Sequence, residues 1–167
     1  MRLSIYMSTF IFVLGGLKAE DRPQWLGVNR DAIWQETGII NMFDQSKPKL
    51  MWRTKIGGGY SGPAVSDGRV FVMDRVGHGT NLRNGSLLHA GKPPENLNFV
   101  KRILTGFERL LCFDEETGQI IWEHKYGCTY SSVAIYAIDP RATPTVDGEH
   151  VYILGAEGDL LCLRVDW

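Results

Sequence analysis

The main pattern along the chain is a set of short runs of consecutive hydrophobic residues separated by turn signals. Four such runs are RVFVM, RLLCF, QIIW and HVYIL, which begin at residues 69, 109, 119 and 150. These runs are rich in β-branched and aromatic residues, which favour strands. A sheet with one face in water would alternate apolar and polar residues, whereas consecutive apolar residues predict strands covered on both faces. The pattern therefore predicts small antiparallel sheets that stack face to face.

The same pattern occurs twice. The stretch PAVSDGRVFVMD, which begins at Pro63, aligns without a gap on PTVDGEHVYILG, which begins at Pro144, and each is followed by a Leu-Leu-Cys run. Glycines at Gly68, Gly118 and Gly148 can adopt the positive φ of tight hairpin turns. The repeating unit is therefore strand, turn, strand, connection and strand. Small antiparallel sheets buried on both sides occur in β-propellers, where they stack around an axis.

The repeats resemble those of the pyrroloquinoline-quinone-like (PQQ-like) β-propellers of the quinoprotein alcohol dehydrogenase-like superfamily. The resemblance rests on LLCFDEETGQIIWEHKY, PAVSDGRVFVMDR and PRATPTVDGEHVYILGAEGDLLCL, and it extends over nearly all of the chain after the first twenty residues or so. It implies an all-β fold, a partial β-propeller of stacked four-stranded antiparallel blades with enough chain for about two to three blades. The structural positions of the repeat are Trp52, Gly68, Asp114, Thr117, Gly118, Trp122 and Gly148, and Trp167 is expected at a packing tryptophan position as well.

The second copy of the repeat departs from the first after its Leu-Leu-Cys run. In the first copy an Asp, a Thr-Gly turn and a strand with Trp122 follow, whereas the second copy continues as RVDW. We therefore expect a truncated N-terminal portion of a propeller, or a chain that another polypeptide completes. An open propeller exposes strand edges and an apolar sheet face, which promote association.

Other segments are expected to have separate roles. Residues 1–19 combine a basic start, an apolar stretch and a small residue, Ala19, before the cleavage site, which is the layout of a signal peptide. The apolar stretch is short for a membrane span, which needs about 20 residues, so we expect a periplasmic or secreted protein with no membrane span after cleavage. A buried N-terminal element is the alternative. Residues 20–47 are expected to join the propeller of residues 48–167, in which residues 75–107 form a long insertion.

Charge and cysteine content narrow the possible classes of protein and of partner. The net charge is −1, from 18 Lys and Arg against 19 Asp and Glu, and removal of residues 1–19 leaves 16 basic residues and a net charge of −3. The sequence contains no basic tract that would suggest nucleic acid as a partner. The three cysteines, Cys112, Cys128 and Cys162, are too few to suggest a disulfide framework. We expect Cys112 and Cys162 to be buried free thiols, although one disulfide among the three remains an open alternative.

No catalytic, cofactor-binding or metal-binding residue is predicted from the sequence. The histidines are scattered without metal-ligand spacing, at His78, His89, His124 and His150. The resemblance implies PQQ and calcium only if the chain is a piece of a quinoprotein dehydrogenase, and the adjacent Cys-Cys pair often used there is absent. Three polar residues beside strands, Asp74, Arg75 and Arg141, are weak candidates for a ligand-binding face. An ordinary surface ion pair or turn is the favoured alternative for them.

Three functional hypotheses follow. The preferred one is an exported noncatalytic propeller that acts as a binding or assembly platform, with a protein or peptide partner or with self-association through open blade edges. The second is an N-terminal fragment of a PQQ-dependent alcohol dehydrogenase-like oxidoreductase, and the third is a nonfunctional remnant. Fold analogy does not choose among them, because function depends on sites rather than on folds.

Overall fold

A computed structural model describes residues 20–37, 48–77, 104–130 and 139–167. The predicted signal peptide, His78, His89 and most of the predicted insertion lie outside these described residues. Within the described ranges there is no helix, and consequently none long and apolar enough to cross a membrane. The prediction of an all-β fold is confirmed.

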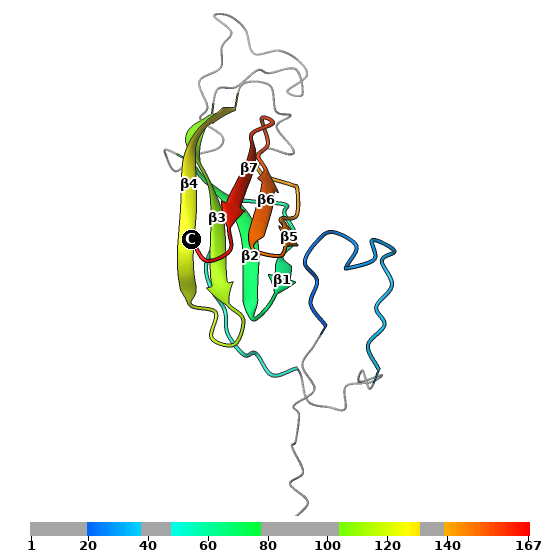
Figure 1. The fold of residues 1–167 in the computed structure, drawn as a ribbon. Helices are drawn as coiled ribbons and strands as arrows, with labels where there is room; N and C mark the ends of the chain where they lie inside the picture. Colours follow the sequence, from blue (N-terminus) through cyan, green and yellow to red (C-terminus); the bar gives the residue numbers. More distant parts are fainter. Residues whose placement is uncertain (1–19, 38–47, 78–103, 131–138) are drawn as a thin grey trace, which may run out of the picture.

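The strands form two antiparallel sheets, one of four strands and one of three (Figure 1). The first sheet has the order β1 (Ala64–Ser66), β2 (Arg69–Gly77), β3 (Leu104–Asp114) and β4 (Ile120–Tyr130). The second sheet has the order β5 (Thr145–Asp147), β6 (His150–Leu154) and β7 (Leu160–Arg164). Each strand therefore pairs with its neighbour in sequence, as in a propeller blade.

The turns between the strands have the geometry that their residues favour. Gly68, Gly118 and Gly148 have φ values of 74°, 67° and 56°, in the region that glycine enters without a Cβ clash. In the β3–β4 turn, the Asp114 carboxylate accepts hydrogen bonds from the Thr117 backbone N–H at 2.8 Å and from its hydroxyl at 2.6 Å. These local bonds define the turn that separates the two longest strands of the first sheet.

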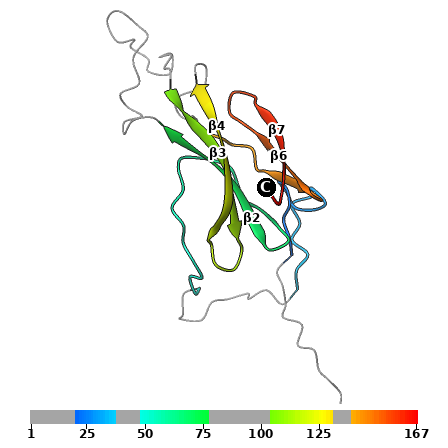
Figure 2. The same cartoon turned by 60° about the vertical axis from the view of Figure 1, so that its left-hand side comes forward.

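The two sheets stack face to face, with the main core between them (Figure 2). The first sheet contributes Phe71, Met73, Leu110, Cys112 and Trp122, and the second contributes Val146, Val151, Ile153 and Leu163. The opposite face of the first sheet carries Val70, Leu111 and Phe113, which pack against Trp52. Both faces of β2 and β3 are thus covered, which explains why their apolar residues are consecutive.

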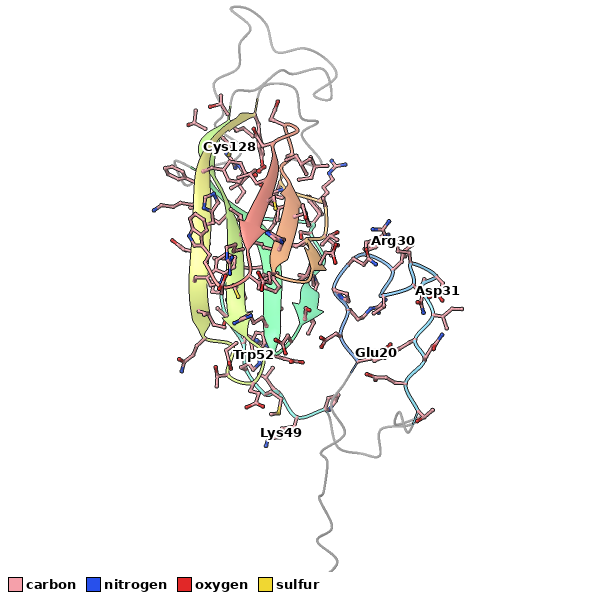
Figure 3. The ribbon with its side chains drawn as sticks, viewed as in Figure 1. Glu20, Arg30, Asp31, Lys49, Trp52 and Cys128 are labelled. Atoms are coloured by element: carbon pink, nitrogen blue, oxygen red, sulfur yellow. The ribbon has the colours of Figure 1, made fainter. Side chains whose placement is uncertain are left out.

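The two tryptophans of the repeat are bound in equivalent ways. Trp52 Nε1 donates to the Glu115 carbonyl at 2.8 Å, and Trp122 Nε1 donates to the Val165 carbonyl at 3.0 Å. Each carbonyl lies three residues after the cysteine of its Leu-Leu-Cys run. The Trp52 ring also stacks on Phe113, with ring centroids 6.4 Å apart; Figure 3 labels Trp52. Each sheet therefore receives a tryptophan from the strand or segment that precedes it in the chain.

The outer face of the second sheet differs from the prediction. Cys112 is buried and Cys162 is exposed, so the expected burial of Cys162 was wrong. On the same face Leu160 is 73% exposed, because no described sheet packs against it. All three cysteines are free thiols, and burial raises the pKa of Cys112 to about 11.

Several strand boundaries also correct the sequence analysis. Asp74 and Arg75 lie within β2 rather than after it, and β4 continues well past Trp122. Both ends of the predicted insertion, residues 75–77 and 104–107, belong to strands. Trp167 is 63% exposed and makes a T-shaped contact with the His124 ring, so it is not buried as Trp122 is.

Candidate functional site

Buried charged side chains gather where β2 ends and β3 begins. This polar cluster consists of Asp74, Arg75, Glu108, Arg109, Tyr126, Tyr130 and Asp139. The strand register explains the cluster, because Asp74 is paired with Arg109, Arg75 with Glu108, and Glu108 with Tyr126. Side chains alternate between the two faces of a sheet, so the cluster has one half on each face of the first sheet.

The first half of the cluster lies on the face that also carries Trp52. Arg109 binds the Asp74 carboxylate through two parallel hydrogen bonds, from Nε to Oδ1 at 2.9 Å and from Nη2 to Oδ2 at 2.6 Å. The Gly57 backbone N–H also donates to Asp74 Oδ2, at 2.6 Å. Bidentate contacts of this kind are among the strongest hydrogen bonds in proteins. Because Arg109 holds the Asp74 carboxylate, the hydrogen bond from the Gly57 N–H fixes the segment around Gly57 against the first sheet.

The second half of the cluster centres on Glu108, on the face toward the second sheet. Its carboxylate accepts hydrogen bonds from the Tyr126 and Tyr130 hydroxyls and, at 3.0 Å, from the Ala156 backbone N–H. Ala156 belongs to the turn between β6 and β7. Burial, with these bonds to Glu108, raises the pKa of both tyrosines above the usual value. Glu108 therefore links the two sheets.

Arg75 is the buried cation of this second half. Its Nη2 donates to the Thr105 carbonyl at 3.0 Å, and its guanidinium lies over the Tyr130 ring, 4.7 Å from the ring centroid. Asp139 Oδ1 lies 3.9 Å from Arg75 Nη1. Arg75 Nε has no hydrogen-bond partner among the described residues. Burial raises the pKa of Asp139 and outweighs the opposing effect of Arg75.

Glycines allow neighbouring backbone to approach the cluster closely. A Cβ at Gly155 would lie 2.6 Å from the Tyr126 hydroxyl, and one at Gly58 would lie 2.5 Å from Asp139 Oδ2. Both distances are too short for real Cβ contacts. The cluster is therefore packed tightly between the first sheet and the loops around it.

This arrangement favours a structural role over a catalytic one. All four carboxylate oxygens of Asp74 and Glu108 already accept hydrogen bonds from the protein. A general base must place a free lone pair within reach of a substrate, and these carboxylates are at most 1% exposed. In the described part of the chain, no group of three or more His, Cys, Asp and Glu residues could hold a metal ion.

The three predicted ligand-face residues are placed differently from one another. Asp74 and Arg75 belong to the polar cluster and are buried, whereas Arg141 is exposed, two residues after Asp139. Sequence reasoning missed Glu108, because nothing in its run signals a buried acid. Its role depends on the pairing of β3 with β4, which brings Tyr126 opposite it.

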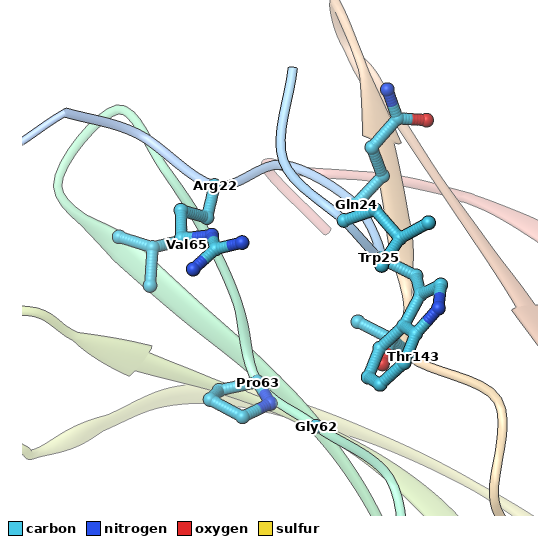
Figure 4. A pocket seen from close by; sticks show the side chains of 8 residues that line it. Arg22, Gln24, Trp25, Gly62, Pro63, Val65 and Thr143 are labelled. Carbon is cyan, nitrogen blue, oxygen red and sulfur yellow. The ribbon is translucent and has the colours of Figure 1, made fainter. Parts of the chain in front are cut away.

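A cavity of about 400 Å³ lies where the N-terminal segment meets the two sheets (Figure 4). This N-terminal pocket is lined by Arg22, Gln24, Trp25, Leu26, Gly62, Pro63, Val65 and Thr143. The Arg22 carbonyl accepts the Val65 N–H at 2.9 Å, and the Pro23 carbonyl accepts the Val146 N–H at 2.7 Å. The segment is therefore anchored to β1 and β5, while the Trp25 indole stays 67% exposed at the pocket.

The stacked sheets, the repeated turns and the equivalent tryptophan contacts define the class of protein, a partial β-propeller built from PQQ-type repeats. A protein-family model described as "Outer membrane protein assembly factor BamB" matches residues 36–166. The chain belongs to this PQQ-repeat family, and the resemblance found in the sequence is confirmed. No curated protein and no solved structure gives a significant match to the chain.

Proposed function

We propose that the protein is an exported, noncatalytic β-propeller platform whose N-terminal pocket binds an extended segment of a partner protein. The observation that carries this proposal is the contrast between the two candidate sites. Asp74, Arg75 and Glu108 of the polar cluster are buried and already hydrogen-bonded within the protein, whereas the N-terminal pocket is open and presents an indole and a guanidinium.

The chemistry of the pocket suits a polypeptide ligand. The exposed Trp25 indole offers a large apolar surface with one polar N–H, and aromatic side chains of this kind often anchor protein interfaces. The Arg22 guanidinium supplies several donors for carbonyl or carboxylate groups. Gly62 and Pro63 keep this side of the pocket free of bulky side chains. An extended peptide with an apolar and an acidic side chain would match these features.

The family supports a partner of this kind. The name of the family refers to a factor in the assembly of outer membrane proteins, and for this chain we propose only the binding of a β-strand-forming polypeptide. Export is supported by the signal-peptide pattern of residues 1–19. An exported propeller in the periplasm would meet such polypeptides before they fold.

Peptide binding tests this proposal. The probe is a fluorescent peptide of about 10 residues with alternating apolar and polar positions, the length of an outer-membrane strand. Its anisotropy should rise on titration with the protein. Trp25→Ala and Arg22→Gln should weaken binding by about tenfold or more, whereas Trp34→Ala is the control, since this exposed tryptophan does not line the pocket. Equal binding by the Trp25→Ala and Trp34→Ala variants would refute the proposed site.

An activity assay tests the noncatalytic part separately. The purified protein would be incubated with PQQ, Ca²⁺, a primary alcohol and a redox dye as electron acceptor. We expect no alcohol-dependent reduction of the dye above the rate without protein. Protein-dependent turnover would favour the quinoprotein dehydrogenase hypothesis and overturn the proposal.

A further inference from the structure

Two parts of the chain have the features of a paired strand but lack a strand partner among the described residues, β7 along one edge and residues 48–56 along both. β7 pairs with β6 along one edge, and no described strand pairs with its other edge. The extended segment of residues 48–56 binds the first sheet through Trp52 and Thr54, but it makes no backbone–backbone hydrogen bond with the described residues. The internal repeat relates these two unpaired elements.

The segment of residues 48–56 is the counterpart of β4. The sequence KLMWRTKIG, which begins at Lys49, aligns on QIIWEHKYG, which begins at Gln119, and places Trp52 on Trp122. Both tryptophans donate to equivalent carbonyls of the sheet that follows. β4, however, also pairs with β3 along its full length, and β7 is the counterpart of β3. Among the described residues, the β4-like segment thus has no β3-like partner, and the β3-like strand β7 has no β4-like partner.

We propose that residues 48–56 of one copy pair with β7 of a second copy and complete its second sheet as a fourth strand. The β3–β4 register gives the expected pairing. Because Cys112 is paired with Trp122, Cys162 of one copy should lie opposite Trp52 of the other. The same register places Lys55 opposite Asp159, by analogy with Arg109 and Lys125. Opposite charges directly across two antiparallel strands stabilise their pairing.

The hydrogen-bonding pattern of β7 agrees with this register. The Gly155 N–H donates to the Asp159 carbonyl and the Val165 N–H donates to the Glu149 carbonyl, so the backbone N–H and C=O groups of the odd-numbered residues of β7 point toward β6. The backbone groups of Leu160 and Cys162 therefore point toward the unpaired edge. In the first sheet, Asp114 donates to the Gln119 carbonyl, so the backbone groups of the even-numbered residues of β3, which include Leu110 and Cys112, point toward β4.

A single copy cannot make this pairing with itself. Trp52 packs on the face of the first sheet that carries Val70 and Phe113, whereas the second sheet packs on the opposite face. Figure 2 shows the extended segment and the second sheet on opposite sides of the first sheet. The contact is therefore head-to-tail between copies, and such heterologous contacts form rings or filaments. With the two described sheets of each copy as blades, a closed propeller would need about two to four copies.

Exposed apolar groups show that the outer face of the second sheet lacks, among the described residues, the cover that the first sheet has. Leu160 is 73% exposed, whereas its counterpart Leu110 is fully buried at 0%. Cys162 is exposed, whereas its counterpart Cys112 is fully buried. A second copy would bring the β4-like segment to the unpaired edge of β7, next to Leu160.

Disulfide trapping tests the register. Both partners would carry Cys162→Ser, with Lys55→Cys in one tagged copy and Asp159→Cys in a second copy of different mass. Directly opposed residues in antiparallel strands have Cα atoms about 4.5–5.5 Å apart, within the range of a disulfide. We expect a mixed dimer on mild oxidation. Lys55→Cys with Asp147→Cys is the control, because Asp147 lies in β5, away from the β7 edge.

Charge reversal tests the same contact without cross-linking. Sedimentation velocity over a range of concentrations should show association of the unmodified chain. Lys55→Asp or Asp159→Lys alone should weaken association by about tenfold, and the double variant should restore it. A chain that stays monomeric, or a control pair that cross-links equally well, would overturn the proposal. Neither residue lines the N-terminal pocket, so this interface and the peptide site can fail independently.

Discussion

Removal of the Glu108 carboxylate is the most direct test of the polar cluster as a link between the sheets. Glu108→Ala would leave three donors without this acceptor, namely the hydroxyl of the buried Tyr130 and, from half-buried residues, the Tyr126 hydroxyl and the Ala156 N–H. Each unsatisfied donor costs about 1–3 kcal/mol. Disruption of a buried charged centre typically costs about 3–5 kcal/mol in total. We therefore expect Glu108→Ala to lower the free energy of unfolding by about 4 kcal/mol.

The expected loss is large beside the total stability of a small domain, which is about 5–15 kcal/mol. Glu108→Gln is the matched variant, because its side chain keeps the shape and one acceptor oxygen while the Tyr126 hydroxyl can accept from its amide. It should cost only about 1–2 kcal/mol. Urea unfolding followed by tryptophan fluorescence measures both values, provided that the slope m is unchanged.

The result that would refute this reasoning is a Glu108→Ala variant within about 0.5 kcal/mol of the unmodified protein, the range of an ordinary surface substitution. A double-mutant cycle with Tyr130→Phe adds a second criterion. If the two side chains act through their hydrogen bond, the two changes together should cost less than their sum. Strict additivity would mean that the bond contributes nothing to stability.

Three further predictions concern groups around the cluster. Gly155→Ala should destabilise the protein by about 1–3 kcal/mol in the same urea experiment, because its Cβ would overlap the polar cluster. Gly127→Ala is the control and should be neutral or slightly stabilising, because its Cβ would meet no atom within 4 Å. The raised pKa values of Tyr126 and Tyr130 predict stability that is present below pH 10, the usual tyrosine pKa, and lost above it. The loss should approach about 1.4 kcal/mol per pH unit for each tyrosine, and the double Phe variant should remove this slope. The pKa of Asp139 is raised from 3.8, so its favourable contribution to stability is present below pH 3.8 and is lost as the pH rises through the folded-state pKa. In thermal unfolding, Asp139→Asn should therefore become more stable relative to the unmodified protein as the pH rises from about 3 to about 7.

The strands and turns could be predicted because their causes are local. Consecutive apolar residues at Val70–Val72 and Leu110–Phe113 indicated strands covered on both faces, and both strands have this property. The turn at Gly118 was visible as a glycine preceded by a short polar stretch. Side-chain periodicity and turn chemistry depend only on neighbours in sequence, so a single sequence contains them.

The polar cluster could not be predicted because it depends on register. Glu108 meets Tyr126 only in the register that β3 and β4 adopt, which shifts between Cys112 and Phe113. A shift of one residue would move Glu108 to the other face of the sheet. Asp74 and Arg75 were identified as polar residues beside a strand, but their burial depends on partners that are 35 and 30 residues away in sequence.

Leu110 and Leu160 separate what a repeat specifies from what its neighbours decide. The two residues occupy the same position in the two copies, yet one is fully buried and the other is 73% exposed. Full burial of a leucine side chain contributes about 1.5–3 kcal/mol, so the second sheet lacks a contribution that the first sheet receives. The first sheet is covered by a sheet on one face and by Trp52 on the other, whereas the described residues cover the second sheet on one face only. The stability of the second sheet should therefore depend on what occupies its outer face and the β7 edge, and association at that edge should protect the β5–β7 amides from hydrogen exchange more than those of β2 and β3.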